Sequence, residues 1–149
     1  MQFRHIRKSI LLTVVASTFA MTSAFAAEYM SVVKDGINLR SGPDTKSEVL
    51  YQLPAGYPLE VLERKGQWLK VSDYEGDKGW IQESMVNKTP HVIVKAKEGN
   101  IRSGPNTTEK IVGSGVREVI FTKVDQKGDW IKISHPDLNG WIHKDLVWP

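Results

Sequence analysis

The chain contains an internal repeat, and the second copy follows the first at an almost constant spacing. The hexapeptide NLRSGP (residues 38–43) returns as NIRSGP (residues 100–105) at an offset of 62. The tripeptide GQW (66–68) returns as GDW (128–130) at the same offset. Self-similarity at a fixed spacing marks a repeated structural unit, so the chain is expected to fold as two modules of about 60 residues.

The boundary between the two modules is expected in the short polar stretch Asn87–Pro90, because Pro90 cannot donate a hydrogen bond to a strand ladder. We therefore predict a first domain over residues 27–88 and a second over residues 89–149. With about five residues between them, the modules have little freedom and should contact each other.

Short β-strands account for the hydrophobic pattern of both modules. In PLEVLER (58–64), Leu59 and Val61 share one face, and Glu60 and Leu62 lie on the other. QWLKVS (67–72) alternates in the same way, and the glycine of ERKGQ (63–67) fits a hairpin turn between the two strands. No stretch after residue 26 keeps a period of 3.6, so we predict an all-β fold of two tandem small β-barrels, whose closure would limit exposed strand edges.

Further turns follow from glycine, asparagine and aspartate. They are expected at YEGDKG (74–79) in the first module and at Asn139-Gly140 in the second. In the repeated hexapeptide, Gly42 permits a positive φ. The residue after each hexapeptide is Asp44 in the first module and Asn106 in the second, and its side chain can accept hydrogen bonds from nearby amides. The hexapeptide is therefore expected to have a folding role in each module.

The first 26 residues have the pattern of a secretory signal peptide. A basic start precedes the apolar run 10–21, and Ala24-Phe25-Ala26 supplies the small residues that a signal peptidase requires. The apolar core is about 12 residues long, shorter than the ~20 needed to span a bilayer, which favours a signal peptide over an uncleaved anchor. Cleavage after Ala26 would export the protein to the periplasm or beyond.

Charge and cysteine content narrow the classes of function. The chain has 20 Lys and Arg against 17 Asp and Glu, a net charge of +3. The predicted signal peptide contains Arg4, Arg7 and Lys8 and no acidic residue, so its removal leaves 17 of each sign. Without a basic patch nucleic-acid binding has no electrostatic basis, and we expect no membrane partner after cleavage. The chain has no cysteine, which excludes a thiol nucleophile and disulfide bonds.

The sequence after residue 26 offers no catalytic or metal-binding pattern. His91, His135 and His143 do not form the short His-x-His or His-Glu-x-x-His spacings typical of zinc sites. Ser134 precedes His135 directly, and neighbours on a strand point to opposite faces, which argues against a serine–histidine pair. Asp73 and the two carboxylates that follow it are expected to be solvated at a hairpin tip. We therefore predict no catalytic residue, metal or cofactor, and a protein that is not an enzyme.

Three motifs in series resemble the bacterial SH3-like domain, SH3b. They are the NLRSGP hexapeptide, a Gly-x-Trp-x-x-Val strand that begins at Gly66, and the closing GWI (79–81). Both modules match over nearly their whole length, about 28–86 and 92–148. The resemblance implies a barrel of about five or six strands, usually exported and often attached to cell-wall hydrolases as a targeting module. GSGVREVIFTKV (113–124) replaces YQLPAGYPLEVL in the second module, which is expected to keep the fold and to lose or alter any ligand site.

Tyrosine is confined to the first module, and this asymmetry indicates where a ligand would bind. Tyrosine combines an apolar face with a hydroxyl and is enriched at recognition surfaces. Tyr51, Tyr57 and Tyr74 are expected to form a groove with Trp68, whose strand neighbours occupy the core face. Arg40 of the hexapeptide, with its counterpart in the second copy, is a further ligand-binding candidate. The alternative is that the tyrosines are partly exposed sheet residues, a position that suits tyrosine.

The expected function is non-catalytic binding in the bacterial envelope, of peptidoglycan or its stem and cross-bridge peptides. An extended peptide can bind in a shallow aromatic groove and form hydrogen bonds with exposed backbone. Two alternatives stay open. The protein could be an adaptor that docks on another envelope protein, or a cell-wall amidase or peptidase that would need a nucleophile or metal.

Overall fold

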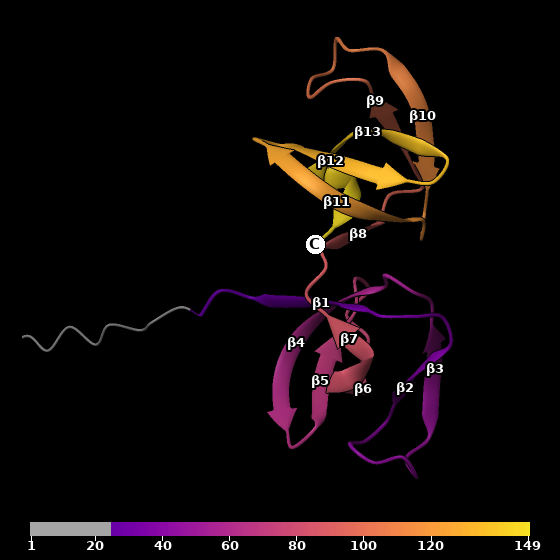
Figure 1. Cartoon of the computed structure of the whole chain (residues 1–149), viewed down its shortest axis with the longest axis vertical. Helices are drawn as coiled ribbons and strands as arrows, with labels where there is room; N and C mark the ends of the chain where they lie inside the picture. The colour runs from indigo at the N-terminus through magenta and orange to yellow at the C-terminus, as the bar shows by residue number, and fades with distance from the viewer. Residues whose placement is uncertain (1–24) are drawn as a thin grey trace, which may run out of the picture.

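The computed structural model describes residues 25–149, so the predicted signal peptide lies almost entirely outside the described residues. The described chain forms two seven-stranded antiparallel sheets, one for each module (Figure 1). These residues contain two short 3-10 helices and no α-helix, which confirms the predicted all-β fold. Within the same range no helix is long and apolar enough to cross a membrane.

The first sheet has the strand order β3-β2-β6-β5-β4-β1-β7. Strands β4, β5 and β6 form a meander, and β1 pairs with both β4 and β7. Because the order ends at β3 and β7, strand β3 has one edge without a strand partner in this sheet. The elements are β1 (Glu28–Val32), β2 (Ile37–Arg40), β3 (Val49–Leu53), β4 (Pro58–Lys65), β5 (Trp68–Ser72), β6 (Lys78–Gln82), η1 (Glu83–Met85) and β7 (Val86–Asn87).

The second sheet repeats this topology strand for strand, in the order β10-β9-β13-β12-β11-β8-β14. The duplication seen in the sequence is therefore a duplication of the fold. The elements are β8 (His91–Val94), β9 (Glu98–Arg102), β10 (Ile111–Val116), β11 (Ile120–Lys127), β12 (Trp130–His135), β13 (Leu138–His143), η2 (Lys144–Leu146) and β14 (Val147–Trp148).

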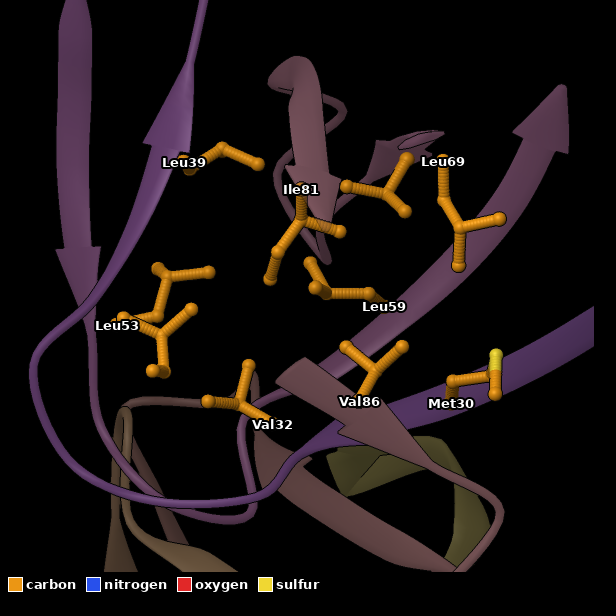
Figure 2. Close-up of a cluster of buried hydrophobic side chains, with 10 residues drawn as sticks. Met30, Val32, Leu39, Leu53, Leu59, Leu69, Ile81 and Val86 are labelled. Atoms are coloured by element: carbon orange, nitrogen blue, oxygen red, sulfur yellow. The ribbon is translucent and has the colours of Figure 1, made fainter. Parts of the chain in front are cut away.

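Each module has its own hydrophobic core, built from alternate residues of its strands. In the first module Leu59, Leu69 and Ile81 are completely buried, as strand alternation predicts for β4 and β5. Figure 2 shows these side chains pointing toward one another from different strands. Burial of each such side chain contributes about 1.5–3 kcal/mol to stability. The second core consists of Val92, Val94, Ile101, Phe121, Ile131, Ile133, Ile142 and Val147.

The hairpins between the long strands turn at glycine in both modules. Gly66, between β4 and β5, has a φ of +60°, and Gly128, between β11 and β12, has a φ of +58°. Glycine reaches such values without steric cost, and it is favoured in two-residue hairpin turns for that reason. The turn predicted in ERKGQ is confirmed.

The turn predicted at Asn139-Gly140 is wrong. Both residues lie inside β13, which runs from Leu138 to His143. His135 of β12 pairs with Leu138 of β13, so the chain reverses at Pro136-Asp137 instead.

Gly140 is required by the close approach of two strands. A Cβ atom on Gly140 would lie 2.6 Å from Cγ2 of Ile101 and 2.7 Å from the carbonyl oxygen of Arg102. Gly79 has the same role in the first module, where a Cβ atom would lie 2.7 Å from Cγ of Leu39. The glycine of each closing GWI therefore allows β6 or β13 to pack against β2 or β9.

The positive φ expected at Gly42 is also wrong. A Cβ atom on Gly42 would lie 2.8 Å from Oγ of Ser47, so a larger residue there would require the serine side chain to move. The predicted side-chain bonds do occur. Oδ1 of Asp44 and Oδ1 of Asn106 each accept a hydrogen bond from the amide two residues later, at 2.6 and 2.9 Å. Positive φ among the described glycines occurs at Gly36, Gly56, Gly66, Gly76 and Gly128.

The two modules contact each other beside the linker. Oγ of Ser31 in the first module donates to the carbonyl oxygen of Thr89 in the linker, at 2.8 Å. The rings of Tyr29 and Trp148 pack edge to face, with centroids 5.4 Å apart. The C-terminus lies where the two sheets approach each other (Figure 1). The modules thus share an interface to which strand β1, the linker and strand β14 contribute.

Candidate functional site: a tyrosine-lined groove

Three of the predicted site residues lie in one groove of the first module, which we call the tyrosine groove. Tyr51 is in β3, Tyr57 precedes β4, and Tyr74 is in the loop between β5 and β6. The groove has a volume of about 420 Å³, within the range of small-ligand sites. Its acidic lining residues are Asp73, Glu75, Asp77 and Glu118.

Each tyrosine hydroxyl of the groove meets a carboxylate. The aromatic rings and the negative charges are thereby held side by side. The donor–acceptor pairs are Tyr51 Oη with Asp77 Oδ2 at 3.3 Å, Tyr57 Oη with Asp73 Oδ2 at 3.4 Å, and Tyr74 Oη with Glu75 Oε1 at 2.7 Å.

Asp73 organises the acidic loop. Its Oδ1 atom accepts hydrogen bonds from the amides of Glu75 and Asp77, both at 2.9 Å. The amide of Asp73 donates to the carbonyl oxygen of Asp77 at 2.9 Å, and Gly76 turns the chain with a φ of +87°. Asp73 is therefore a structural acceptor as well as a lining residue. Among residues 25–149, this loop included, no group of three or more His, Cys, Asp or Glu side chains could hold a metal ion.

The environment of the groove raises the pKa of each of its three tyrosines. Burial raises the pKa of Tyr57 well above its ordinary value of 10.0, and the charge of Asp73 adds to the shift. Burial, followed by hydrogen bonds to two glutamates, raises the pKa of Tyr74. The charge of Asp77 raises the pKa of the exposed Tyr51. At neutral pH all three tyrosines are hydroxyl donors.

Glu118 reaches the groove from the second module. Its Oε1 atom accepts a hydrogen bond from Oη of Tyr74 at 3.0 Å. It is the one non-glycine residue with a positive φ, +73°, among residues 25–149. Its counterpart Gly56 has a φ of +79°. The amide of Gly56 donates to the carbonyl oxygen of Val32, and the amide of Glu118 donates to that of Val94, both at 2.8 Å. A left-handed conformation costs a glutamate about 1 kcal/mol, so the second module supplies this carboxylate at some cost in stability.

The other two predicted site residues, Trp68 and Arg40, lie outside the tyrosine groove. They line a separate pocket of about 150 Å³ together with Asn38. Trp68 is half-buried and off the core face, as strand alternation predicts. The five predicted residues are thus divided between two places.

The sequence contains no signal that the carboxylates of the groove belong to a site. Glu75 and Asp77 are exposed, as expected for a hairpin tip, and with Asp73 they lie beside the tyrosines. Glu118 has one indirect signal in the sequence, because it occupies the position of Gly56 at the repeat offset of 62. That alignment marks an unusual backbone position and does not indicate a contact with the other module.

The matching surface of the second module is occupied by aliphatic side chains. Gly113 stands at the position of Tyr51, and Val119 stands at that of Tyr57. Leu138 packs onto Gly113, where a Cβ atom would lie 2.6 Å from Cδ2 of the leucine. The second module therefore keeps the topology of the first and has a different surface at this position.

Two family models match the chain, and both are described as a bacterial SH3 domain. The first matches residues 35–87 and the second matches residues 95–149. One match falls on each sheet, and together they span more than half of the chain.

The curated relatives are longer proteins named as amidases. A Bacillus subtilis (strain 168) protein, named as a candidate N-acetylmuramoyl-L-alanine amidase (YrvJ), is 24% identical over 141 residues, which are 87% of this chain and 27% of that protein. A Staphylococcus epidermidis protein, named as a candidate cell wall amidase (LytH), is 32% identical over 50 residues, which are 33% of this chain and 17% of that protein. The chain thus spans about a quarter or less of the length of these relatives.

Two solved structures are similar at a lower level. NlpC2 from Trichomonas vaginalis is 19% identical with a TM-score of 0.36, over 85% of this chain and 49% of that one. An NlpC/P60 family protein from Bacillus cereus ATCC 10987 is 15% identical with a TM-score of 0.39, over 81% of this chain and 56% of that one. At these values the likeness supports no conclusion about this chain.

Proposed function

Because the chain belongs to the bacterial SH3 domain family and carries two such domains in tandem, we propose that it binds peptidoglycan in the bacterial envelope without acting on it as an enzyme. The ligand is an amino group of a wall peptide, and the tyrosine groove is its binding site. Relatives named as amidases of the cell wall support an association with the wall. The predicted signal peptide supports export to the periplasm or beyond.

The observation that carries this proposal is the placement of three tyrosine rings beside four carboxylates. An ammonium group is attracted to the faces of aromatic rings and forms strong hydrogen bonds with carboxylates. None of the described residues that line the groove is Lys or Arg, so no internal cation neutralises it. Wall peptides carry free amino groups wherever a cross-link has not formed, and these groups suit such a site.

The position of strand β3 supports an extended peptide as the ligand. This strand ends the hydrogen-bonded order of the first sheet, so its outer edge has backbone groups that a further strand could pair with. Tyr51, Gln52 and Leu53 belong both to β3 and to the lining of the groove. A wall peptide that paired with this edge would place an amino side chain among the tyrosines.

The chemistry of the groove favours binding over reaction. Its tyrosines have raised pKa values, which makes them poor general bases and nucleophiles at neutral pH. Asp73 is engaged by two backbone amides and by Tyr57. These groups can hold a cation, and they lack an activated partner for attack on an amide bond.

Sedimentation with purified sacculi tests this proposal. Residues 25–149 are expected to pellet with mock-treated sacculi at low and moderate salt. Sacculi whose amino groups have been acetylated should retain much less protein, because acetylation removes the positive charge. Equal pelleting with both preparations would contradict the assignment of an amino group. No pelleting with either would contradict wall binding itself.

The alternative functions give different results. An adaptor would recover a stoichiometric protein partner from envelope extract and would not bind sacculi. A hydrolase would clear wall material in a zymogram, and a metal-dependent one would lose the band in chelator.

A further inference from the structure

Each module carries a second pocket, and the two pockets are built from equivalent positions. Each member of one pocket lies 61 or 62 residues from its counterpart in the other. We call them the Arg–Trp pockets. The first is lined by Gly36, Ile37, Asn38, Arg40, Thr45, Trp68, Gln82 and Met85. The second is lined by Glu98, Gly99, Asn100, Arg102, Thr107, Trp130, His143 and Leu146.

Four of the eight lining positions hold the same residue in both modules, namely the asparagine, arginine, threonine and tryptophan, whereas none of the groove tyrosines is repeated. Core packing does not explain this identity. Thr45 and Thr107 are exposed, and Trp68 and Trp130 are half-buried on the outer face of their strands. The threonines and tryptophans are under little constraint from the core, so a shared ligand is the better reason for their identity, whereas each arginine also holds its own loop.

The two arginines have guanidinium donors to spare. Nη1 of Arg40 donates to the carbonyl oxygen of Ser47 at 2.9 Å, and Nη1 of Arg102 donates to that of Glu109 at 3.0 Å. Within residues 25–149 neither arginine forms an ion pair with a carboxylate. A guanidinium presents five N–H donors in a planar fork that matches a carboxylate. Each loop bond fixes the arginine and leaves part of this fork for a ligand.

The remaining residues of the pockets suit a sugar ring. A tryptophan offers a flat apolar surface to the C–H face of a sugar, with its polar N–H at the rim. The asparagine and threonine side chains supply both donors and acceptors for hydroxyl and acetamido groups. In the second pocket the ring of Trp130 is fixed edge to face against His143, with centroids 5.2 Å apart and an interplanar angle of 88°.

We propose that each Arg–Trp pocket binds one carboxylate-bearing sugar, so that the tandem modules hold an acidic glycan strand at two points. This site is separate from the tyrosine groove and does not depend on it. A strand long enough to engage both pockets at once would bind more tightly than a strand held by either pocket alone. The second pocket has a volume of about 400 Å³ against about 150 Å³ for the first, and its lining includes the exposed carboxylate of Glu98, which disfavours an anion, so the two pockets are expected to differ in affinity.

Heteronuclear NMR of the indole N–H groups of residues 25–149 tests this proposal. The probe is a set of N-acetylated glycan strands stripped of peptide, whose muramic acid residues then carry free carboxylates. The signals of Trp68 and Trp130 are expected to shift, while those of Trp80 and Trp148, which line neither pocket, stay in place. Strands whose carboxylates have been converted to methylamides should bind about tenfold more weakly, since the charged hydrogen bonds are lost.

Variants separate ligand binding from folding. N38A and N100A should each weaken binding about three- to tenfold, and the double variant should weaken it further. N139A is the matched control, since Asn139 is exposed and lines neither pocket, and it should bind as the parent protein does. Equal binding of methylamide strands, unshifted signals of Trp68 and Trp130, or parent-like affinity in N38A/N100A would each overturn the proposal. The probe carries no free amino group, so the result is independent of the tyrosine groove.

Discussion

At the scale of single residues, Glu118 shows how the two modules have come to differ. Both modules need a left-handed residue in the same turn, and the first uses Gly56. A Cβ atom on Gly56 would lie 2.9 Å from Cδ2 of His91, so a larger residue there would have to displace side chains of the second module. The equivalent position in the second module accommodates a side chain, which carries its carboxylate to Tyr74.

The strain at position 118 predicts an unusual order of stability. Glu118→Gly and Glu118→Ala both remove the carboxylate, and only the alanine variant must keep a φ near +73° with a Cβ atom. The glycine variant is expected to have the higher free energy of unfolding, by about 1 kcal/mol. Urea unfolding of the two proteins measures the difference. An alanine variant as stable as the glycine variant would show that the backbone is not strained.

At the scale of strands and turns, the sequence predicts what local alternation controls. β4 and β5 begin and end within one residue of the predicted strands 58–64 and 67–72. Prediction fails where the cause lies in another part of the chain. Gly140 is a glycine because a side chain and a carbonyl oxygen of a crossing strand lie within 3 Å of where a Cβ atom would be, and Gly42 lies close to Ser47 of its own loop. No local pattern reports such contacts.

The same limit applies to the candidate site. Tyr51, Tyr57 and Tyr74 lie together in one groove, as predicted from the confinement of tyrosine to the first module. Trp68 and Arg40 line a different pocket. Strand alternation predicts that a side chain points away from the core, but it does not predict which pocket on the outside of the sheet that side chain lines. Glu118 arrives through the packing of two modules, for which the sequence has no local signal. A role in ligand binding for each of these residues stays a prediction.

Because β13 and β9 approach closely at Gly140, adding one methyl group there is expected to lower the free energy of unfolding substantially. Gly140→Ala is expected to destabilise the protein by about 1–3 kcal/mol, because the new Cβ atom would overlap Ile101 and a backbone carbonyl oxygen. Asn139→Ala, next to it on the same strand and exposed, should change the free energy of unfolding by less than about 0.5 kcal/mol. Urea unfolding compares the two variants. Similar stabilities would mean that the strands separate easily.

At the scale of the whole molecule, duplication has been followed by a division of roles. The first module carries the tyrosines and most of the acidic groups, and the second contributes Glu118 across the interface. The groove therefore depends on both modules, although the second module lacks the tyrosines. A short linker and shared contacts between the modules hold the two parts of the groove together.

The most direct test compares two variants of equal net charge in the sacculus assay. Asp77→Asn with Glu118→Gln removes two carboxylates from the groove, and Glu63→Gln with Asp125→Asn removes two exposed carboxylates outside it. The groove variant is expected to lose most of its pelleting, while the control variant pellets as the parent protein does. Equal pelleting of the two variants would contradict the assignment of the tyrosine groove as the site that binds the wall.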